Sequence, residues 1–274
     1  MMDEWDEEET QPDELRALLA DGLHALMFLT RLPVRWPSGL DLPPLAQSSR
    51  AFGLVGLVIG AAAGCVGFVA SLLGLSSLVA ACLAIGFGII ISGAMAEDGF
   101  ADMADGFWGG QSLTRKLEIM RDSRIGAYGV LALGLSLILR VGLASMVIEQ
   151  AGAFYLIFAL AGAASLGRGL MVPMMAKLPP ARADGLSASA GQPSTRIARQ
   201  AMIFSAISGA VLFWLTGGIF ATGLGLLLGF AAAEGISRLA RHHIGGQTGD
   251  VCGALSLSVE MASLAGLAMV LGNM

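Results

Sequence analysis

Long apolar stretches alternate with short polar segments along this chain from residue 51 onward. Each stretch approaches the roughly 20 apolar residues that an α-helix needs to cross a bilayer. The pattern predicts an all-α protein, a polytopic integral membrane helical bundle. Its candidate spans are residues 51–72, 77–96, 126–148, 151–176, 201–215, 218–237 and 251–271. Because the fifth is short and a break at Gly217 and Gly218 follows it, we expect six to seven transmembrane helices.

An amphipathic helix is predicted ahead of the first span, over residues 13–32. Its apolar side chains recur at helical spacing with charged residues between them, which is typical of a helix lying on a membrane surface. The apolar positions are Leu15, Leu18, Leu19, Leu23, Leu26 and Met27. The stretch RLPVRWPSGLDLPP, with four prolines, then ends the helix and forms an irregular link.

The first twelve residues are acidic and are expected to form a disordered tail in solvent. They lack the basic n-region of a secretory signal, so we expect no cleaved leader. Residues 13–274 are then expected to form a single membrane-embedded domain.

Lysine and arginine side chains cluster in alternate connections between the predicted spans. They precede the first span and lie between spans two and three, four and five, and six and seven. The short turns near residues 74–76, 149–150 and 217–218 carry none. Because cytoplasmic loops carry an excess of Lys and Arg, the longer polar loops are predicted to lie on the cytoplasmic side.

Composition agrees with a membrane protein. Apolar residues make up 55% of the chain and charged residues 14%, and the mean hydropathy is +0.73; soluble domains carry about 25% charged residues. Cys65, Cys82 and Cys252 have neither metal-ligand nor disulfide spacing and are expected to be small core residues. No basic stripe with interleaved aromatics is present, which argues against a nucleic-acid partner. A homo-oligomer is compatible with the sequence.

The segment EDGFADMADGFWGG, at the cytoplasmic end of the second predicted span, carries four carboxylates. Asp98, Asp102 and Asp105 are spaced i, i+4, i+7, so on a helix they share a sector of roughly 60°. Like charges on successive turns repel, and a divalent cation such as Mg²⁺ or Mn²⁺ offsets that repulsion. The alternative is a solvated helix end. Apolar residues between the acids favour a face turned toward a cavity.

Two further polar segments accompany the acids. RKLEIMRDSRIGAYG places Arg121, Asp122, Ser123 and Arg124 ahead of the third span. Cations beside a metal cluster suit a phosphate or diphosphate substrate, although such charges also set topology. Arg168, near the cytoplasmic end of the fourth span, is expected to reach the same cavity.

The third segment, RHHIGGQTGD, precedes the last span. Gly245, Gly246 and Gly249 allow a ligand to approach the backbone closely, and Thr248 and Asp250 add polar groups.

Several other polar residues in or near the spans are predicted to have structural rather than catalytic roles. His242 and His243 are expected to be ordinary interface residues. Arg140 is expected to snorkel or to pair with Glu149. Glu234 and Glu260 are expected to be buried carboxylates whose partners the sequence does not identify.

Taken together and in this order, the three segments resemble those of the adenosylcobinamide-GDP ribazoletransferase, or cobalamin synthase, family. FLTRLPV at residues 28–34 also resembles the opening of that family, and the resemblance runs from about residue 24 to the C-terminus. It implies a multi-pass enzyme of the bacterial inner membrane with its active site on the cytoplasmic side. That enzyme would use Mg²⁺ to join adenosylcobinamide-GDP to α-ribazole, or its 5′-phosphate, releasing GMP.

The resemblance also implies roles for particular residues. The metal ligands would be Glu97, Asp98, Asp102 and Asp105. The catalytic residues would be Asp98, Asp102, Asp105 and Asp122. The sequence does not identify which of these carboxylates is the general base. Substrate phosphates and neighbouring groups would be bound by Arg121, Ser123, Arg124, Arg168, Gly245, Gly246, Thr248, Gly249 and Asp250.

The chain departs from the family pattern at two positions. Ala96 stands where many members have His, and Leu257 stands where a Glu is expected, although Glu260 remains. These departures put a ligand role at either position in doubt.

Two other functions remain as alternatives. A CDP-alcohol phosphotransferase also uses spaced aspartates, but its DxxDGxxAR motif is absent here. A transporter or channel would place carboxylates near the middle of the membrane rather than at one edge.

Overall fold

The computed structural model describes residues 11–273, and helices are the regular elements of that range. They are α1 (Gln11–Leu29), α2 (Leu45–Ser48), the 3₁₀ helix η1 (Ser49–Ala51), α3 (Phe52–Leu72), α4 (Ser77–Ser92), α5 (Met95–Gly109), α6 (Leu113–Ile119), α7 (Ala127–Ala151), α8 (Tyr155–Lys177), α9 (Leu186–Ala190), α10 (Thr195–Ile244) and α11 (Gly249–Leu271). Residues 1–10 of the predicted acidic tail lie outside the described residues, and Gln11 and Pro12 already belong to α1.

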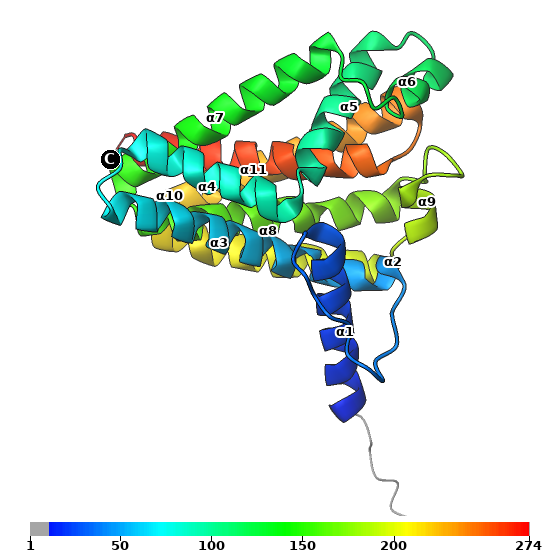
Figure 1. Cartoon of the computed structure of the whole chain (residues 1–274), viewed down its shortest axis with the longest axis horizontal. Helices are drawn as coiled ribbons and strands as arrows, with labels where there is room; N and C mark the ends of the chain where they lie inside the picture. Colours follow the sequence, from blue (N-terminus) through cyan, green and yellow to red (C-terminus); the bar gives the residue numbers. More distant parts are fainter. Residues whose placement is uncertain (1–10, 274) are drawn as a thin grey trace, which may run out of the picture.

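The predicted membrane bundle is confirmed. By length and composition, five described helices are able to cross a membrane, or six if the bent pair α4–α5 counts as one crossing. Within α10, Gly217 and Gly218 have non-helical backbone angles, so its 50 residues form two helices. The two arms run back to the same end of the molecule (Figure 1), and Phe213 on the first lies against Gly225 on the second. With the arms counted separately and α4–α5 counted as one crossing, the described helices give seven candidate crossings.

The second predicted span ends earlier than expected. Residues 77–96 were predicted as one helix, but α4 stops at Ser92 and α5 leaves it at 88°. Gly93 and Ala94 at the break both have left-handed backbone angles, with φ of 66° and 57°. This conformation is strained for Ala94, a residue with a Cβ. The acidic segment therefore forms a helix of its own, separate from the end of a straight span.

Small residues hold the bundle tightly together along α3 and α8. A Cβ placed on Gly60 would lie 2.2 Å from the carbonyl oxygen of Leu160, and one on Gly56 would lie equally close to that of Ala164. Such spacing of small residues lets helix backbones approach in a membrane, where packing rather than water drives association. The prediction for the cysteines is wrong in part: Cys252 is buried, but Cys65 and Cys82 are exposed on the outer faces of α3 and α4.

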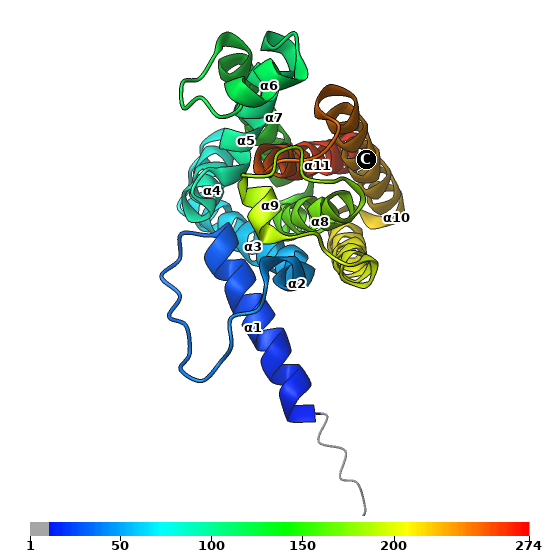
Figure 2. The ribbon, with the colours of Figure 1, turned by 90° about the vertical axis from the view of Figure 1, so that its right-hand side faces the viewer.

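Helix α1 crosses one end of the bundle and projects away from it (Figure 2). Its last turns are buried at Ala25 and Leu29. Its projecting part exposes Leu15, Leu18 and Leu19, as the amphipathic pattern predicted. The short helices α2, α6 and α9 gather at the same end of the spans, and the tight turns lie at the other (Figure 1). All the longer polar loops thus meet at one end, where the candidate site lies.

Candidate functional site

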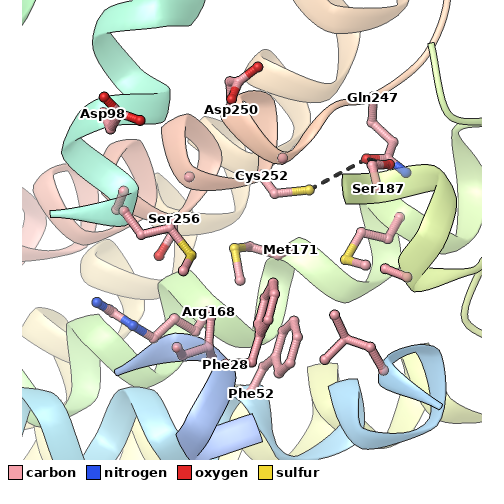
Figure 3. Close-up of a pocket in the computed structure, with 18 of the residues that line it drawn as sticks. Phe28, Phe52, Asp98, Arg168, Met171, Ser187, Gln247, Asp250, Cys252 and Ser256 are labelled. Atoms are coloured by element: carbon pink, nitrogen blue, oxygen red, sulfur yellow. Dashed lines mark hydrogen bonds between the residues drawn. The ribbon is translucent and has the colours of Figure 1, made fainter. Parts of the chain in front are cut away.

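Helix α5 lies directly against the first turn of α11. A Cβ on Gly99 would stand 2.6 Å from the carbonyl oxygen of Asp250, so a side chain at residue 99 would separate the two helices. This contact places Asp98 and Asp250 on one cavity of about 220 Å³, together with Arg182 from the α8–α9 loop. In Figure 3 the two carboxylates lie on one side of the cavity, and Phe28 and Phe52 lie on the other. The first and third sequence segments therefore meet here.

A second cavity, of about 340 Å³, joins the acidic helix to the α6–α7 loop. Its lining includes Asp98, Asp102, Arg121, Asp122 and Ser123. The structure thus brings the first and second segments together as predicted. Asp98 is exposed and lines both cavities, so it lies where all three segments converge.

Asp102 is the half-buried member of this carboxylate group. The negative charges of Asp98, Asp250 and Asp105 disfavour its own negative charge, and the positive charge of Arg182 opposes them. A diphosphate would add further negative charge to such a site. Binding one there therefore requires additional positive charge.

Asp105 has a different environment from its two neighbours. It is buried, and its two carboxylate oxygens accept hydrogen bonds from the backbone N–H groups of Gly126 at 2.7 Å and Gly129 at 2.9 Å. These N–H groups belong to the start of α7, where backbone donors lack partners within the helix. A Cβ on Gly129 would lie 2.4 Å from the Asp105 Oδ2 atom. Asp105 is therefore held against the start of α7, and its role as a metal ligand stays a prediction.

Glu97, the fourth predicted ligand, uses one of its oxygens in a buried ion pair, and its Oε2 atom has no hydrogen-bond partner in the described structure. Its Oε1 atom accepts a hydrogen bond of 2.8 Å from Arg140 on α7, and both side chains are buried. The prediction that Arg140 snorkels or pairs with Glu149 is wrong. A carboxylate and a guanidinium at this depth are each costly alone, and their pairing reduces that cost.

The assignment of these four carboxylates as metal ligands stays a prediction. Among the described residues, no group of three or more His, Cys, Asp or Glu side chains is arranged to hold a metal ion. The structure does leave two oxygen ligands, Asp98 and Asp102, one turn apart on the lining of the same cavity. Mg²⁺ usually binds one or two carboxylates together with substrate phosphates, so this pair suits an ion that arrives with its substrate.

The predicted phosphate-binding arginines of the α6–α7 loop already have acidic partners. Arg121 pairs with Asp184, which links this loop to the α8–α9 loop, and Arg124 pairs with Asp122 at 2.7 Å. The hydrogen bonds from Arg124 lower the pKa of Asp122 to about 2. A general base works best with a pKa near the operating pH, so Asp122 is poorly suited to that role.

Arg168 likewise has a partner. Its guanidinium pairs with Glu260 on α11, which supplies the partner that the sequence did not identify for Glu260. Arg168 does line the 220 Å³ cavity, but its charge is offset by this carboxylate.

Arg182 is the cation that sequence reasoning missed. It donates to Asp250 at 3.2 Å, while its Nε and Nη1 atoms are buried and have no hydrogen-bond partner in the described structure. Buried guanidinium donors without partners are costly, and they suit a phosphate group supplied by a ligand. In the sequence Arg182 was one of several loop charges that set topology, and nothing local distinguished it.

The glycine-rich segment serves mainly to shape the backbone. Gly245 ends α10 with φ of 68°, and a Cβ on Gly246 would lie 2.4 Å from the carbonyl oxygen of Pro179. Thr248 caps α11 by accepting the N–H of Val251 at 3.3 Å. Gly249 lines the 220 Å³ cavity together with Gln247 and Asp250 of the same segment.

The remaining predicted polar residues lie outside the two cavities. His243 stacks on Phe107 with ring centroids 4.6 Å apart and contacts Lys116 at 2.9 Å, as expected of an interface residue. Glu234, predicted to be buried, is exposed and pairs with Arg238.

Together the fold and the site define a polytopic membrane protein with a carboxylate- and arginine-lined pocket at one end of its bundle. The chain belongs to the CobS family, described as cobalamin-5-phosphate synthase, which matches residues 21–268. It is 43% identical to the adenosylcobinamide-GDP ribazoletransferase of Azorhizobium caulinodans, over 91% of this chain and 96% of the relative. It is 41% identical to that of Brucella anthropi, over 93% and 98% of the two chains. No solved structure shows a significant match. The family resemblance inferred from the three segments is thus confirmed.

Proposed function

We propose that this protein is an adenosylcobinamide-GDP ribazoletransferase, a late enzyme of cobalamin biosynthesis. Family membership over most of the chain supports the activity. The observation that carries the assignment of the site is the position of Asp98, where the two cavities and the three segments meet. The two substrates are adenosylcobinamide-GDP and α-ribazole or its 5′-phosphate.

The reaction replaces the phosphoanhydride bond of the diphosphate by a phosphate ester bond. A free ribose hydroxyl of the ribazole forms a bond to the phosphorus atom that stays with cobinamide, and the bond from that phosphorus to GMP breaks. The reacting oxygen is not O5′, because O5′ is already esterified in the 5′-phosphate substrate. The hydroxyl proton passes to a carboxylate, and GMP leaves with the electron pair. We assign the proton-accepting role to Asp98 or Asp102, because Arg124 holds the pKa of Asp122 at about 2.

Arg182 is proposed to bind the diphosphate through its unpartnered Nε and Nη1 donors. In phosphoryl transfer the protein mainly positions groups and offsets charge, and a guanidinium does both. Asp98 and Asp102 are proposed to hold Mg²⁺, with the diphosphate completing its coordination. When bound, Mg²⁺ offsets the charge that develops on the phosphate and on the departing GMP.

The enzyme is proposed to lie in the bacterial inner membrane with this site facing the cytoplasm. The basic residues of the longer loops lie at the end of the bundle that carries the site, in agreement with the positive-inside rule. Inverted membrane vesicles are therefore expected to convert externally added substrates, whereas right-side-out vesicles are not.

The test is a coupled assay of GMP release. Membranes containing the protein receive adenosylcobinamide-GDP, α-ribazole and Mg²⁺, and the A. caulinodans relative is run in parallel. GMP and a cobamide are expected in equal amounts, with loss of both products when the metal is chelated. Absence of product, while the relative is active, would overturn the proposal. Arg182→Ala is expected to lose turnover, whereas Arg196→Ala, an exposed arginine on α10, is expected to retain it.

A further inference from the structure

The 220 Å³ cavity has an apolar half that the phosphate chemistry does not use. Phe28 and Phe52 are stacked, with ring centroids 6.0 Å apart and an angle of 9° between planes. Met171 and Met175 from α8 line the same cavity. Aromatic faces and thioether side chains suit a flat aromatic ligand, because methionine adapts to its shape and aromatic rings stack on it.

Among the polar residues that line this part of the cavity, Arg168 already pairs with Glu260. The Ser256 hydroxyl on α11 is buried and lacks a hydrogen-bond partner in the described structure, and the residue lines the cavity. Its place among the lining residues is visible in Figure 3. An unpartnered buried hydroxyl costs free energy that a ligand acceptor would recover. By contrast, Gln247 on the opposite wall already accepts from Ser187 at 2.7 Å.

The size of the cavity limits which substrate part can occupy it. An engineered protein cavity of about 150 Å³ binds benzene, so a volume of about 220 Å³ suits an aromatic group of two fused rings. A corrin macrocycle is far larger. Guanine carries several hydrogen-bonding groups on its edges, including O6, N7 and the N2 amino group. Few partners remain for them here, because Arg168 pairs with Glu260 and Ser187 pairs with Gln247, which leaves the Ser256 hydroxyl unpartnered.

We infer that this cavity binds the heteroaromatic base of the nucleoside substrate, with Ser256 donating to an unsubstituted ring nitrogen. This inference rests on the proposed function. The base lies against Phe28, Phe52 and the two methionines, and its ribose extends toward the carboxylates. That orientation directs the reacting ribose hydroxyl to Asp98, at the boundary with the second cavity. The same residues then determine which base the enzyme accepts.

Steady-state kinetics with each substrate varied in turn tests the inference. Met171→Ala is expected to raise the KM for ribazole about tenfold, since it removes apolar contact with the base. Met174→Ala is the matched control, because Met174 is a buried methionine of the same helix that lines a different cavity. Ser256→Ala is expected to raise the KM for ribazole about two- to tenfold. Its control is Ser263→Ala, whose hydroxyl donates to the Glu260 carbonyl oxygen. The KM for adenosylcobinamide-GDP is expected to stay unchanged in all four.

Binding of free benzimidazole to the full-length protein in detergent supplies a measurement independent of turnover. Benzimidazole is expected to bind the unaltered protein, to compete with ribazole and to bind Ser256→Ala more weakly. If GMP release is absent while benzimidazole binds in this way, the proposed function fails and the base site stands. If turnover is present but Met171→Ala and Ser256→Ala raise only the KM of the corrinoid substrate, the base site is refuted and the proposed function stands. Absence of competition between benzimidazole and ribazole would also refute it.

Discussion

The contact between Asp105 and the start of α7 gives the sharpest stability prediction. Asp105→Ala removes a buried carboxylate that accepts the N–H groups of Gly126 and Gly129 at 2.7 and 2.9 Å. Hydrogen bonds to charged groups contribute about 1.5–3 kcal/mol each. The free energy of unfolding is therefore expected to fall by about 3–6 kcal/mol, and both N–H groups lose their side-chain acceptor.

Thermal unfolding in detergent measures this change. At about 2 °C or more per kcal/mol for a chain of this size, the Tm of Asp105→Ala is expected to fall by at least about 6 °C. Gly129→Ala is expected to cause a comparable loss, because its Cβ would lie 2.4 Å from Asp105 Oδ2. Gly134→Ala on the same helix is the control. Its Cβ meets nothing within 4 Å, so its Tm is expected to remain the same or rise.

The double variant separates this contact from a general effect of alanine at residue 129. In the Asp105→Ala background, Gly129→Ala is expected to cost much less than in the unaltered protein, because the clashing carboxylate is gone and the contact with Ile125 Cγ1 at 3.0 Å is the close one that remains. Additive losses in the double variant would refute the reasoning. A Tm for Asp105→Ala equal to that of the unaltered protein would also refute it.

Three further predictions concern other contacts. Glu97→Gln leaves Arg140 buried without its anion, and the free energy of unfolding is expected to fall by about 3–5 kcal/mol, measured by denaturation in detergent; an unchanged value would contradict the pairing. Gly60→Ala is expected to lower the Tm by forcing α3 and α8 apart, whereas Gly86→Ala, with nothing within 4 Å of its Cβ, is expected to leave it unchanged. Arg124 lowers the pKa of Asp122 to about 2, so Asp122 is ionised well below neutral pH. Asp122→Asn is therefore expected to leave the shape of the pH–rate profile around neutrality unaltered. Loss of the acidic limb of that profile would instead assign the general base to Asp122.

Much of the fold follows from hydrophobic pattern alone. The spans corresponding to α3, α7, α8 and α11 were predicted close to their observed bounds, and Gly217 and Gly218 do interrupt α10. The bend between α4 and α5 was not predicted, because apolar residues continue across Gly93 and Ala94. Mean hydropathy over a window does not register a change of direction. The exposure of Cys65 and Cys82 was missed because apolar residues in a bilayer face lipid as well as the protein core.

The sequence predicted which segments form the candidate site, but it did not predict which side chains pair within it. The three segments do meet at one end of the bundle, with Asp98 and Asp250 on the same cavity. The pairing of Glu97 with Arg140 depends on how α5 and α7 pack, and i, i+4 spacing carries no information about that. Gly126 and Gly129 stand at the start of a predicted span, where backbone N–H groups lack partners within the helix. That position indicates a need for an acceptor, which Asp105 supplies.

Arg182 is a candidate site residue that no sequence motif identifies. In the sequence it resembles the other loop arginines, and its distinction is that two of its donors are buried without partners. That property arises only when the α8–α9 loop folds against the first turn of α11. A loop cation of this sort is identified by its surroundings in three dimensions rather than by a motif.

The rate of GMP release by purified Asp98→Asn tests the central claim most directly, because this residue lies at the junction of the two cavities. The substitution preserves size and removes the charge that is proposed to hold Mg²⁺ or accept the proton. The rate is expected to fall at least about 100-fold, with the Tm unchanged. Asp41→Asn, at an exposed loop position, is expected to keep full activity. Turnover by Asp98→Asn equal to that of Asp41→Asn would contradict the account.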